Sequence, residues 1–329
     1  MRTPDFWYTP PHDPTFLARC LNPLGKVYSL ATAKRVARDP TFQPDVPVVC
    51  VGNINAGGTG KTPTVIAVLG ILTDTFQSPH VVTRGYGGSL KGPVRVDPSR
   101  HSAAEVGDEP LLLAAFAEVW VAQDRAAGAR AAQQAGASVI VLDDGFQNPT
   151  LRKDLNIVVV DAQKGFGNGR CLPAGPLREP VNIGLARADV LLSVGAPGAQ
   201  ARFDRTDLPA DLLHLRAALD PLQTGMEWPG TRAIAFAGIA HPEKFFATLK
   251  NLGADVVHTE ALDDHQPLTS ALMKRLEADA TRLGAQLITT EKDAVRLPSS
   301  FRHKVITLPV RLNFGTDIAI LKSKLTDLF

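Results

Sequence analysis

The sequence has one stretch whose residue types and spacing are those of a phosphate-binding loop. A valine-rich run, Pro47–Gly52, is followed by the ten residues NINAGGTGKT and then by helix formers, Val65–Leu72. A strand, a glycine-rich loop and a helix in this order bind phosphate through backbone N–H groups and the positive end of the helix. The loop lysine reaches the β- and γ-phosphates, and the hydroxyl that follows it binds Mg²⁺. The sequence therefore predicts a site for a nucleoside triphosphate and Mg²⁺, with the nucleotide-binding residues Asn55, Ala56, Gly57, Gly58, Thr59, Gly60, Lys61 and Thr62.

The metal of such a site needs a carboxylate at the end of a neighbouring strand. One apolar run ends in Asp143 and Asp144, and another ends in Asp161. We favour Asp143 and Asp144, together with Thr62, because paired carboxylates before a glycine suit a divalent ion in a turn. The loop has Asn55 where its usual pattern has glycine, and asparagine tolerates the positive φ that the turn would need.

The segment Pro14–Arg38 has five basic residues and no acidic residue. Its apolar residues recur at helical spacing, which predicts a basic amphipathic helix. Asn22 and Pro23 have the residue types of an N-cap and a first helical position, so we expect the helix to restart there. Such a helix lies either in the headgroup region of an anionic membrane or against the protein's own core with its basic face in water.

The elements that position these residues alternate as in an α/β fold. Strands are expected near residues 79–83, 118–122, 138–142, 156–161 and 189–194. With helices between them, this pattern predicts a P-loop NTPase-like parallel sheet flanked by helices, with its ligand at the carboxyl ends of the strands. A second α/β pattern begins near residue 232, so we expect the active cleft between two α/β domains.

These patterns divide the chain into four parts. They are an N-terminal amphipathic segment (1–40), a P-loop domain (41–200), a linker region (201–230) and a smaller C-terminal α/β domain (231–329). The sequence does not decide whether the last predicted helix, 314–328, returns to the P-loop domain.

The composition fits a globular chain of about two domains, with 329 residues, 44% hydrophobic residues and a net charge of +2. This charge is low for a nucleic-acid-binding protein, so no nucleic-acid partner is predicted. Three widely spaced cysteines argue against a disulfide framework and a cysteine-built metal site. No apolar run is long enough to span a membrane and no signal peptide is recognised, so these totals predict a cytoplasmic protein.

Several further motifs follow one another along the chain. They are VGNINAGGTGKTP (51–63), TRGYGG (83–88), VGDEP (106–110), LDDGFQ (142–147) and LPAGPLREP (172–180), with fainter ones at FAGI (236–239), Asp264-His265 and TEKD (290–293). With these motifs the sequence resembles the tetraacyldisaccharide 4′-kinases of lipid A biosynthesis. It departs from that family's pattern at Asn148 and Gln266, where the family often has histidine.

The resemblance implies ATP- and Mg²⁺-dependent phosphorylation of the 4′-hydroxyl of a membrane-embedded, acylated glucosamine disaccharide 1-phosphate, which forms the lipid A precursor lipid IVA. It also favours membrane contact for the N-terminal helix. We therefore expect a peripheral enzyme on the anionic cytoplasmic face of the bacterial inner membrane. The resemblance implies no protein partner.

The resemblance also assigns catalytic roles outside the loop. Asp108 is the expected base for the acceptor hydroxyl, and His265 is expected to orient it. Arg178 is expected either to stabilise phosphate charge in the transition state or to clamp the 1-phosphate of the substrate, with a surface ion pair as the alternative. Within the loop, Lys61 is the further catalytic residue, expected at the β- and γ-phosphates. From the residues alone, Asp108 would be a helix N-cap and His265 an exposed loop histidine.

Two more acids, Glu109 and Glu179, are expected near the metal. Arg84 and Arg125 are further candidates for binding phosphate, with surface ion pairs as the alternative. Gln147 either orients a ligand or makes a hydrogen bond at the end of a strand.

Two other functions are weighed against a kinase. A membrane-associated switch ATPase of the deviant Walker class has a similar loop, but it usually carries a signature lysine where this chain has Asn55 and Ala56. A non-enzymatic nucleotide-binding scaffold would not need the surplus of carboxylates among the motifs.

Overall fold

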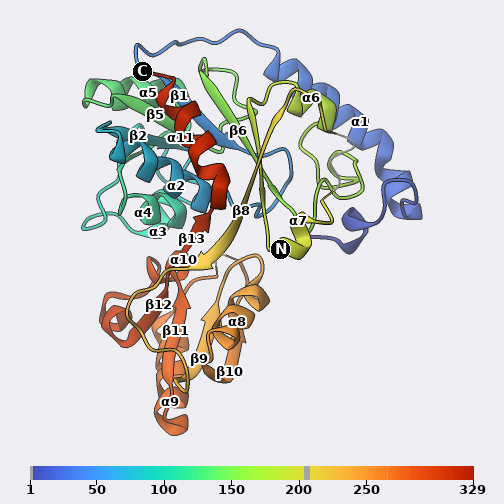
Figure 1. Cartoon of the computed structure of the whole chain (residues 1–329). Coiled ribbons are helices and arrows are strands. Elements are labelled where there is room, and N and C mark those ends of the chain that lie inside the picture. The colour runs from blue at the N-terminus through green and yellow to red at the C-terminus, as the bar shows by residue number, and fades with distance from the viewer. Residues whose placement is uncertain (1–2, 204–207, 265) are drawn as a thin grey trace.

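The computed structural model describes residues 3–203, 208–264 and 266–329, which form two α/β units (Figure 1). Within these ranges nine strands form a large sheet in the order β13-β8-β7-β6-β1-β5-β2-β4-β3. Its strands are β1 (Val48–Gly52), β2 (Pro79–Thr83), β3 (Val94–Arg95), β4 (Glu118–Val121), β5 (Val139–Asp143), β6 (Leu155–Asp161), β7 (Val190–Val194), β8 (Leu213–Pro221) and β13 (Val310–Asn313). This mainly parallel sheet, flanked by helices, confirms the predicted fold class.

Helices cover the large sheet on both faces. They are α2 (Lys61–Asp74), α3 (Ala103–Val106), α4 (Asp108–Leu113), α5 (Arg125–Gln134), α6 (Val181–Leu185), α7 (Pro197–Gln200) and α11 (Ile318–Thr326). Along β1, Val49 packs in the same cluster as α2, α4 and α11, whereas Val48 and Cys50 pack in the same cluster as α5. Successive residues of a strand point to opposite faces, so an unbroken apolar strand is stable only when both faces are covered.

Parallel pairing brings the polar ends of neighbouring strands to one edge of this sheet. β5 pairs with β1 so that Asp143 lies opposite Val51, and β2 pairs with β5 so that Val82 lies opposite Leu142. The loop after β1, the carboxylates after β5 and the end of β2 therefore meet at the carboxyl edge, where α/β sheets bind their ligands.

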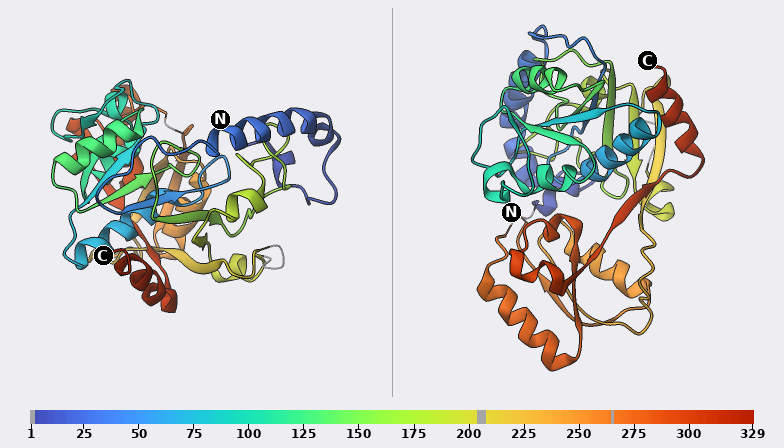
Figure 2. Two further views of the ribbon diagram at one scale, coloured as in Figure 1. Left: turned by 90° about the horizontal axis from the view of Figure 1, so that it is seen from above. Right: turned by 90° about the vertical axis from the view of Figure 1, so that its left-hand side faces the viewer.

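The smaller sheet forms the C-terminal unit, which lies below the large unit in both Figure 1 and the right panel of Figure 2. Its described strands run parallel in the order β10-β9-β11-β12. The elements are β9 (Arg232–Ala237), α8 (Pro242–Asn251), β10 (Asp255–Ala261), α9 (Ser270–Leu283), β11 (Gln286–Thr290), α10 (Glu291–Ala294) and β12 (Val305–Leu308). Buried apolar residues on both faces of this sheet give the unit a core of its own.

After β12 the chain returns to the large unit. There β13 pairs antiparallel with β8, with Val310 opposite Pro221, and α11 packs on α2. The range 201–230, expected as a linker, contains the long strand β8, and the last helix lies with the large unit.

The N-terminal helix α1 (Phe16–Val36) extends beside the large unit (Figure 2, left). Its N-cap is Thr15, whose side chain accepts the backbone N–H of Ala18. The helix runs through Pro23 without restarting at Asn22, so that expectation is wrong. A proline removes one backbone hydrogen bond, and a helix of 21 residues keeps enough of the others to continue.

The face of α1 that meets the protein is made of small residues. Ala18, Gly25 and Thr32, at every seventh position, are buried. A Cβ added at Gly25 would lie 2.8 Å from the carbonyl oxygen of Cys171, so the helix approaches the large unit closely there. Tyr28 also packs against the core of the large unit, whereas five large apolar side chains of α1 are exposed: Phe16, Leu17, Leu24, Val27 and Leu30. No helix in the described part of the chain combines the length and the apolarity needed to cross a membrane.

Candidate active site

The loop between β1 and α2 presents the amino end of a helix. Gly57 and Gly60 have φ values of +104° and +96°, in the region that favours glycine, and α2 begins at Lys61 directly after Gly60. Inside the loop, Asn53 Nδ2 donates to Thr59 Oγ1 at 3.0 Å. The first N–H groups of a helix have no partner within the helix, so this geometry suits a bound phosphate.

Asn55 stands at the first glycine position of the loop pattern without a positive φ. The non-glycine residues with positive φ in the described chain are Phe76 and Asp144. The side chain of Asn55 is buried, and its Nδ2 donates to the carbonyl of Gly165 at 3.0 Å. The expectation that asparagine stands here because it tolerates a positive φ is therefore wrong. Instead, the side-chain amide of Asn55 connects the loop to the segment after β6 by a hydrogen bond.

Asp144, directly after β5, lies between two cations. Its Oδ1 is 3.7 Å from Lys61 Nζ and 2.8 Å from Arg178 Nη1. Burial alone would raise the pKa of Asp144, but Lys61 and Arg178 hold this pKa below its ordinary value. Three of the predicted site residues are therefore in contact at the carboxyl edge of the sheet.

Asp143 differs from its neighbour because it is buried and, among the described residues, forms no ion pair with a cation. Its Oδ2 accepts a hydrogen bond from Thr83 Oγ1 at 2.9 Å. Burial, together with the nearby charges of Glu109 and Asp144, raises the pKa of Asp143 to about 7, although Lys61 and the hydrogen bond from Thr83 act in the opposite direction. Part of this shift comes from neighbouring carboxylates, so like charges lie close together at this edge of the sheet.

Carboxylates gathered in this way fit a divalent cation. Among the described residues, no group of three or more His, Cys, Asp and Glu side chains is arranged to hold a metal ion. Mg²⁺ usually takes only one or two protein carboxylates and completes its shell with water and substrate phosphates. Asp143, Asp144 and the Thr62 hydroxyl on the first turn of α2 are donors of that kind.

Asp108 is the first residue of α4, and it faces the C-terminal unit. The N-cap of this helix is Gly107, so Asp108 is not the cap. The Asp108 side chain is 3% exposed, and its Oδ1 accepts the backbone N–H of Glu109 at 3.0 Å. A Cβ at Gly107 would lie 2.7 Å from the carbonyl oxygen of Tyr86, so glycine is required for this tight entry to α4. His265, the expected partner of Asp108, lies outside the described residues.

Two cations that were not among the predicted site residues lie opposite Asp108 and Glu109. Lys292 Nζ is 3.4 Å from Glu109 Oε1, and Arg296 Nε is 3.8 Å from Asp108 Oδ2. Burial alone would lower the pKa of Lys292, but Glu109, Asp108 and Asp264 raise it above its ordinary value. The TEKD motif contains Lys292 and was the only signal in the sequence.

Glu179 has protein donors on both of its oxygens. Gln147 Nε2 donates to Glu179 Oε1 at 2.8 Å, and Arg187 Nη2 donates to Oε2. The same Gln147 amide donates to the carbonyl of Asn53 at 2.8 Å, and Arg178 Nη1 lies 3.4 Å from Gln147 Oε1. These contacts indicate that Glu179 holds the phosphate-binding loop and Arg178 in place.

The two weaker arginine candidates differ in their surroundings. Arg84 is exposed at the end of β2. Arg125 is buried, and its Nη1 donates to the carbonyl of Ala122 at 3.2 Å, so the surface ion pair is not what is observed for Arg125.

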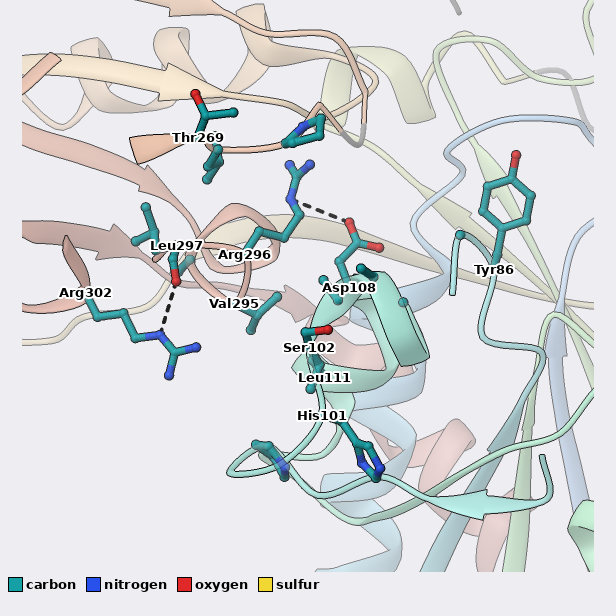
Figure 3. A pocket seen from close by; sticks show the side chains of 18 of the residues that line it. Tyr86, His101, Ser102, Asp108, Leu111, Thr269, Val295, Arg296, Leu297 and Arg302 are labelled. Carbon is teal, nitrogen blue, oxygen red and sulfur yellow. Dashed lines mark hydrogen bonds and ion pairs between the residues drawn. The ribbon is translucent and has the colours of Figure 1, made fainter. Parts of the chain in front are cut away.

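A cavity of about 810 Å³ lies beside Asp108 (Figure 3). Its walls come from both units: Gly107–Leu111 and the preceding turn on one side, and Pro267–Thr269 and Ala294–Leu297 on the other. Asp108 and Arg296 point toward one another in its wall, as Figure 3 shows. Asp108 is therefore reached from an opening between the two units.

Comparison with known proteins identifies the family. The family model described as "LpxK: Tetraacyldisaccharide-1-P 4′-kinase" matches residues 17–329. A tetraacyldisaccharide 4′-kinase of Dinoroseobacter shibae is 65% identical over 322 residues, which are 97% of this chain and 96% of the relative. One from a Jannaschia species is 57% identical over 314 residues, 95% of this chain and 94% of the relative.

A solved structure agrees with these relatives. The crystal structure of LpxK from Aquifex aeolicus, described as a complex with ATP, matches with a TM-score of 0.78 and 25% identity. The match covers 95% of this chain and 100% of that one. The resemblance inferred from the motifs is thus confirmed. The chain belongs to the LpxK family of tetraacyldisaccharide-1-P 4′-kinases.

Proposed function

We propose that this kinase transfers the γ-phosphoryl group of ATP to the 4′-hydroxyl of a tetraacylated glucosamine disaccharide 1-phosphate, which gives lipid IVA. The observation that carries the proposal is the meeting of Lys61, Asp144 and Arg178 at the amino end of α2, beside the buried Asp143. Phosphoryl transfer depends on positioning and on balancing charge, and this edge of the sheet supplies cations and a place for a metal.

The loop Asn55–Thr62 binds the phosphates of ATP through its backbone N–H groups and Lys61. Thr62, Asp143 and Asp144 would hold Mg²⁺, with Glu109 near enough to add to their field, and the metal would neutralise charge on the phosphates. We do not propose Glu179 as a ligand, because Gln147 and Arg187 occupy its oxygens. The family's match to a structure described with ATP supports the nucleotide.

Asp108 acts as the base. It accepts the proton of the 4′-hydroxyl as the bond from that oxygen to the γ-phosphorus forms and the bond from phosphorus to the bridging oxygen of ADP breaks. His265 orients Asp108, as expected from the resemblance. Arg178 stabilises the charge that develops on the transferred group, and its contacts with Asp144 and Gln147, close to Lys61 of the loop, support this role.

We also propose that α1 lies on the anionic cytoplasmic face of the inner membrane, so that the enzyme is peripheral. Phe16 is 83% and Leu30 is 70% exposed, and the helix meets the protein with small residues instead. Burying a large apolar side chain contributes about 1.5–3 kcal/mol, and each basic residue near anionic lipid adds about 1 kcal/mol. Five exposed apolar residues and the basic residues of α1 therefore suffice for reversible binding.

The activity is tested with radiolabelled ATP and the acylated disaccharide 1-phosphate in detergent micelles. We expect label in the lipid with the native protein, and a loss of at least about 100-fold with Lys61→Ala. Lys91→Ala, which removes an exposed lysine away from the loop, is the matched control. Hydrolysis of ATP without any label in the lipid would refute the kinase assignment for this substrate.

A further inference from the structure

A buried arginine of the C-terminal unit faces the proposed base of the large unit. The side chains of Arg296 and Asp108 are 7% and 3% exposed, and Arg296 Nε lies 3.8 Å from Asp108 Oδ2 (Figure 3). Taking two opposite charges out of water is costly unless each is well paired. A buried ion pair between two units therefore needs better geometry and more hydrogen bonds than a surface ion pair to offset its desolvation cost.

The C-terminal unit holds the guanidinium group of Arg296 from several sides. Nη1 donates to the carbonyl of Gln266 at 2.9 Å, and Nη2 donates to the carbonyl of Gly238 at 3.1 Å and to Asp293 Oδ1. Asp293 is fully buried and accepts the backbone N–H of Gly238 and the hydroxyl of Thr290. The position of the guanidinium is therefore fixed before it meets Asp108.

Nε is the one guanidinium nitrogen of Arg296 that takes no part in these contacts. It is buried and has no hydrogen-bond partner among the described residues. Asp108 Oδ2 lies 3.8 Å from Nε, about 1 Å beyond the usual distance of a charge-assisted hydrogen bond. A small approach of the two units would complete that bond.

We infer that Arg296 is a positioning residue for Asp108, through which the C-terminal unit sets the orientation of the base. The inference rests on the proposed role of Asp108. Oδ1 of Asp108 accepts the N–H of Glu109, and Oδ2 faces Arg296. With both oxygens located, the carboxylate has a fixed orientation toward the acceptor proton.

A second ion pair keeps the two units in register. Lys292 lies four residues before Arg296 and pairs with Glu109, which follows Asp108. Two cations of one short segment thus meet two consecutive acids of α4, and α10 packs on α4. One ion pair would leave the segment free to rotate, whereas two neighbouring pairs define its orientation toward the base.

The test compares Arg296→Ala with Arg302→Ala in the full-length enzyme. Arg302 lines the same cavity, but its Nε donates to the carbonyl of Leu297. We expect Arg296→Ala to lower kcat by about 10- to 100-fold with KM for ATP within about twofold, and Arg302→Ala to leave both near native values. Arg296 lines a cavity of about 810 Å³, so millimolar guanidinium should restore part of the lost kcat.

A second pair of variants separates positioning from a structural role. In an Asp108→Asn background, Arg296→Ala should cause no further loss of residual turnover, and guanidinium should restore none. An equal loss in both backgrounds, without rescue, would overturn the inference, as would native turnover of Arg296→Ala. If Arg296→Ala does not fold, Arg296→Lys is used: its ammonium cannot make the same three contacts, and native turnover would overturn the inference.

These experiments also separate the inference from its premise. Native turnover of Asp108→Asn would remove Asp108 as the base and the inference with it. Loss of turnover in Asp108→Asn, combined with native turnover in Arg296→Ala, would leave the base in place and overturn only the role of Arg296.

Discussion

The carboxyl of Asp143 should destabilise the metal-free protein as the pH rises. Its pKa is raised from 3.8 to about 7, first by burial and then by Glu109 and Asp144. The folded protein keeps this proton to about pH 7, while the unfolded chain releases it near pH 3.8. The stabilising effect of the protonated form is therefore present below pH 3.8 and is lost as the pH rises through about 7.

The substitution Asp143→Asn removes this loss. The amide has nearly the shape of the carboxyl, and its oxygen can accept the hydrogen bond from Thr83. A pKa raised from 3.8 to about 7 corresponds to roughly 4 kcal/mol above pH 7 as an upper bound. The variant should therefore be more stable than the native protein by a few kcal/mol at about pH 8, and by about 1–2 kcal/mol at about pH 5.

Urea unfolding in EDTA, followed through the transition of the large unit, measures this difference across pH. The matched control is Asp144→Asn, where the sign reverses: Lys61 and Arg178 lower the pKa of Asp144, so its contribution is present above the ordinary pKa and is lost in acid. Adding Mg²⁺ should raise the free energy of unfolding of the native protein more than it raises that of the Asp143→Asn variant. A stability difference for Asp143→Asn that is absent at pH 8, or that does not change with pH, would refute the reasoning.

Three further predictions concern the other parts of the site. Asp108→Asn should lower kcat by about 10²- to 10⁴-fold with little change in far-UV circular dichroism; near-native kcat in the lipid assay would exclude it as the base. Glu179→Ala should lower the free energy of unfolding by about 1–3 kcal/mol, because it leaves Gln147 and the partly exposed Arg187 without their acceptor, and Mg²⁺ affinity measured by calorimetry should change little. Phe16→Ser with Leu30→Ser should reduce sedimentation with anionic vesicles far more than turnover of a short-chain substrate, and unchanged sedimentation would contradict membrane binding by this face of α1.

The parts of the site that are contiguous in sequence could be predicted. Lys61 and Thr62 follow their loop directly, and Asp143 and Asp144 end an apolar run, so strand order alone brings them together. The alternation of apolar strands and helices was likewise enough for the fold class. Asn55 shows the limit, because its hydrogen bond to Gly165 depends on a segment more than a hundred residues away.

Contacts between distant segments could not be predicted. Arg296 reaches Asp108 only because α10 of the C-terminal unit packs on α4 of the large unit. No spacing in the sequence predicts that packing. Strand β8 was hidden because prolines at both ends of its region suggested a linker. The apolar stripe of α1 could be recognised in the sequence. Only the structure shows that the small residues Ala18, Gly25 and Thr32 are the ones buried against the protein.

The pairing of β8 with β13 says how the C-terminal unit is built into the molecule. Val310 lies opposite Pro221, and Leu222 N–H donates to the carbonyl of Pro309, so residues 222–309 occupy the place of a hairpin loop. An insert whose two ends lie on adjacent strands adds little entropy cost to closing its host sheet, provided that it folds by itself. Because these two connections lie side by side, the C-terminal unit that carries Arg296 is tethered to the large sheet by two strands rather than one.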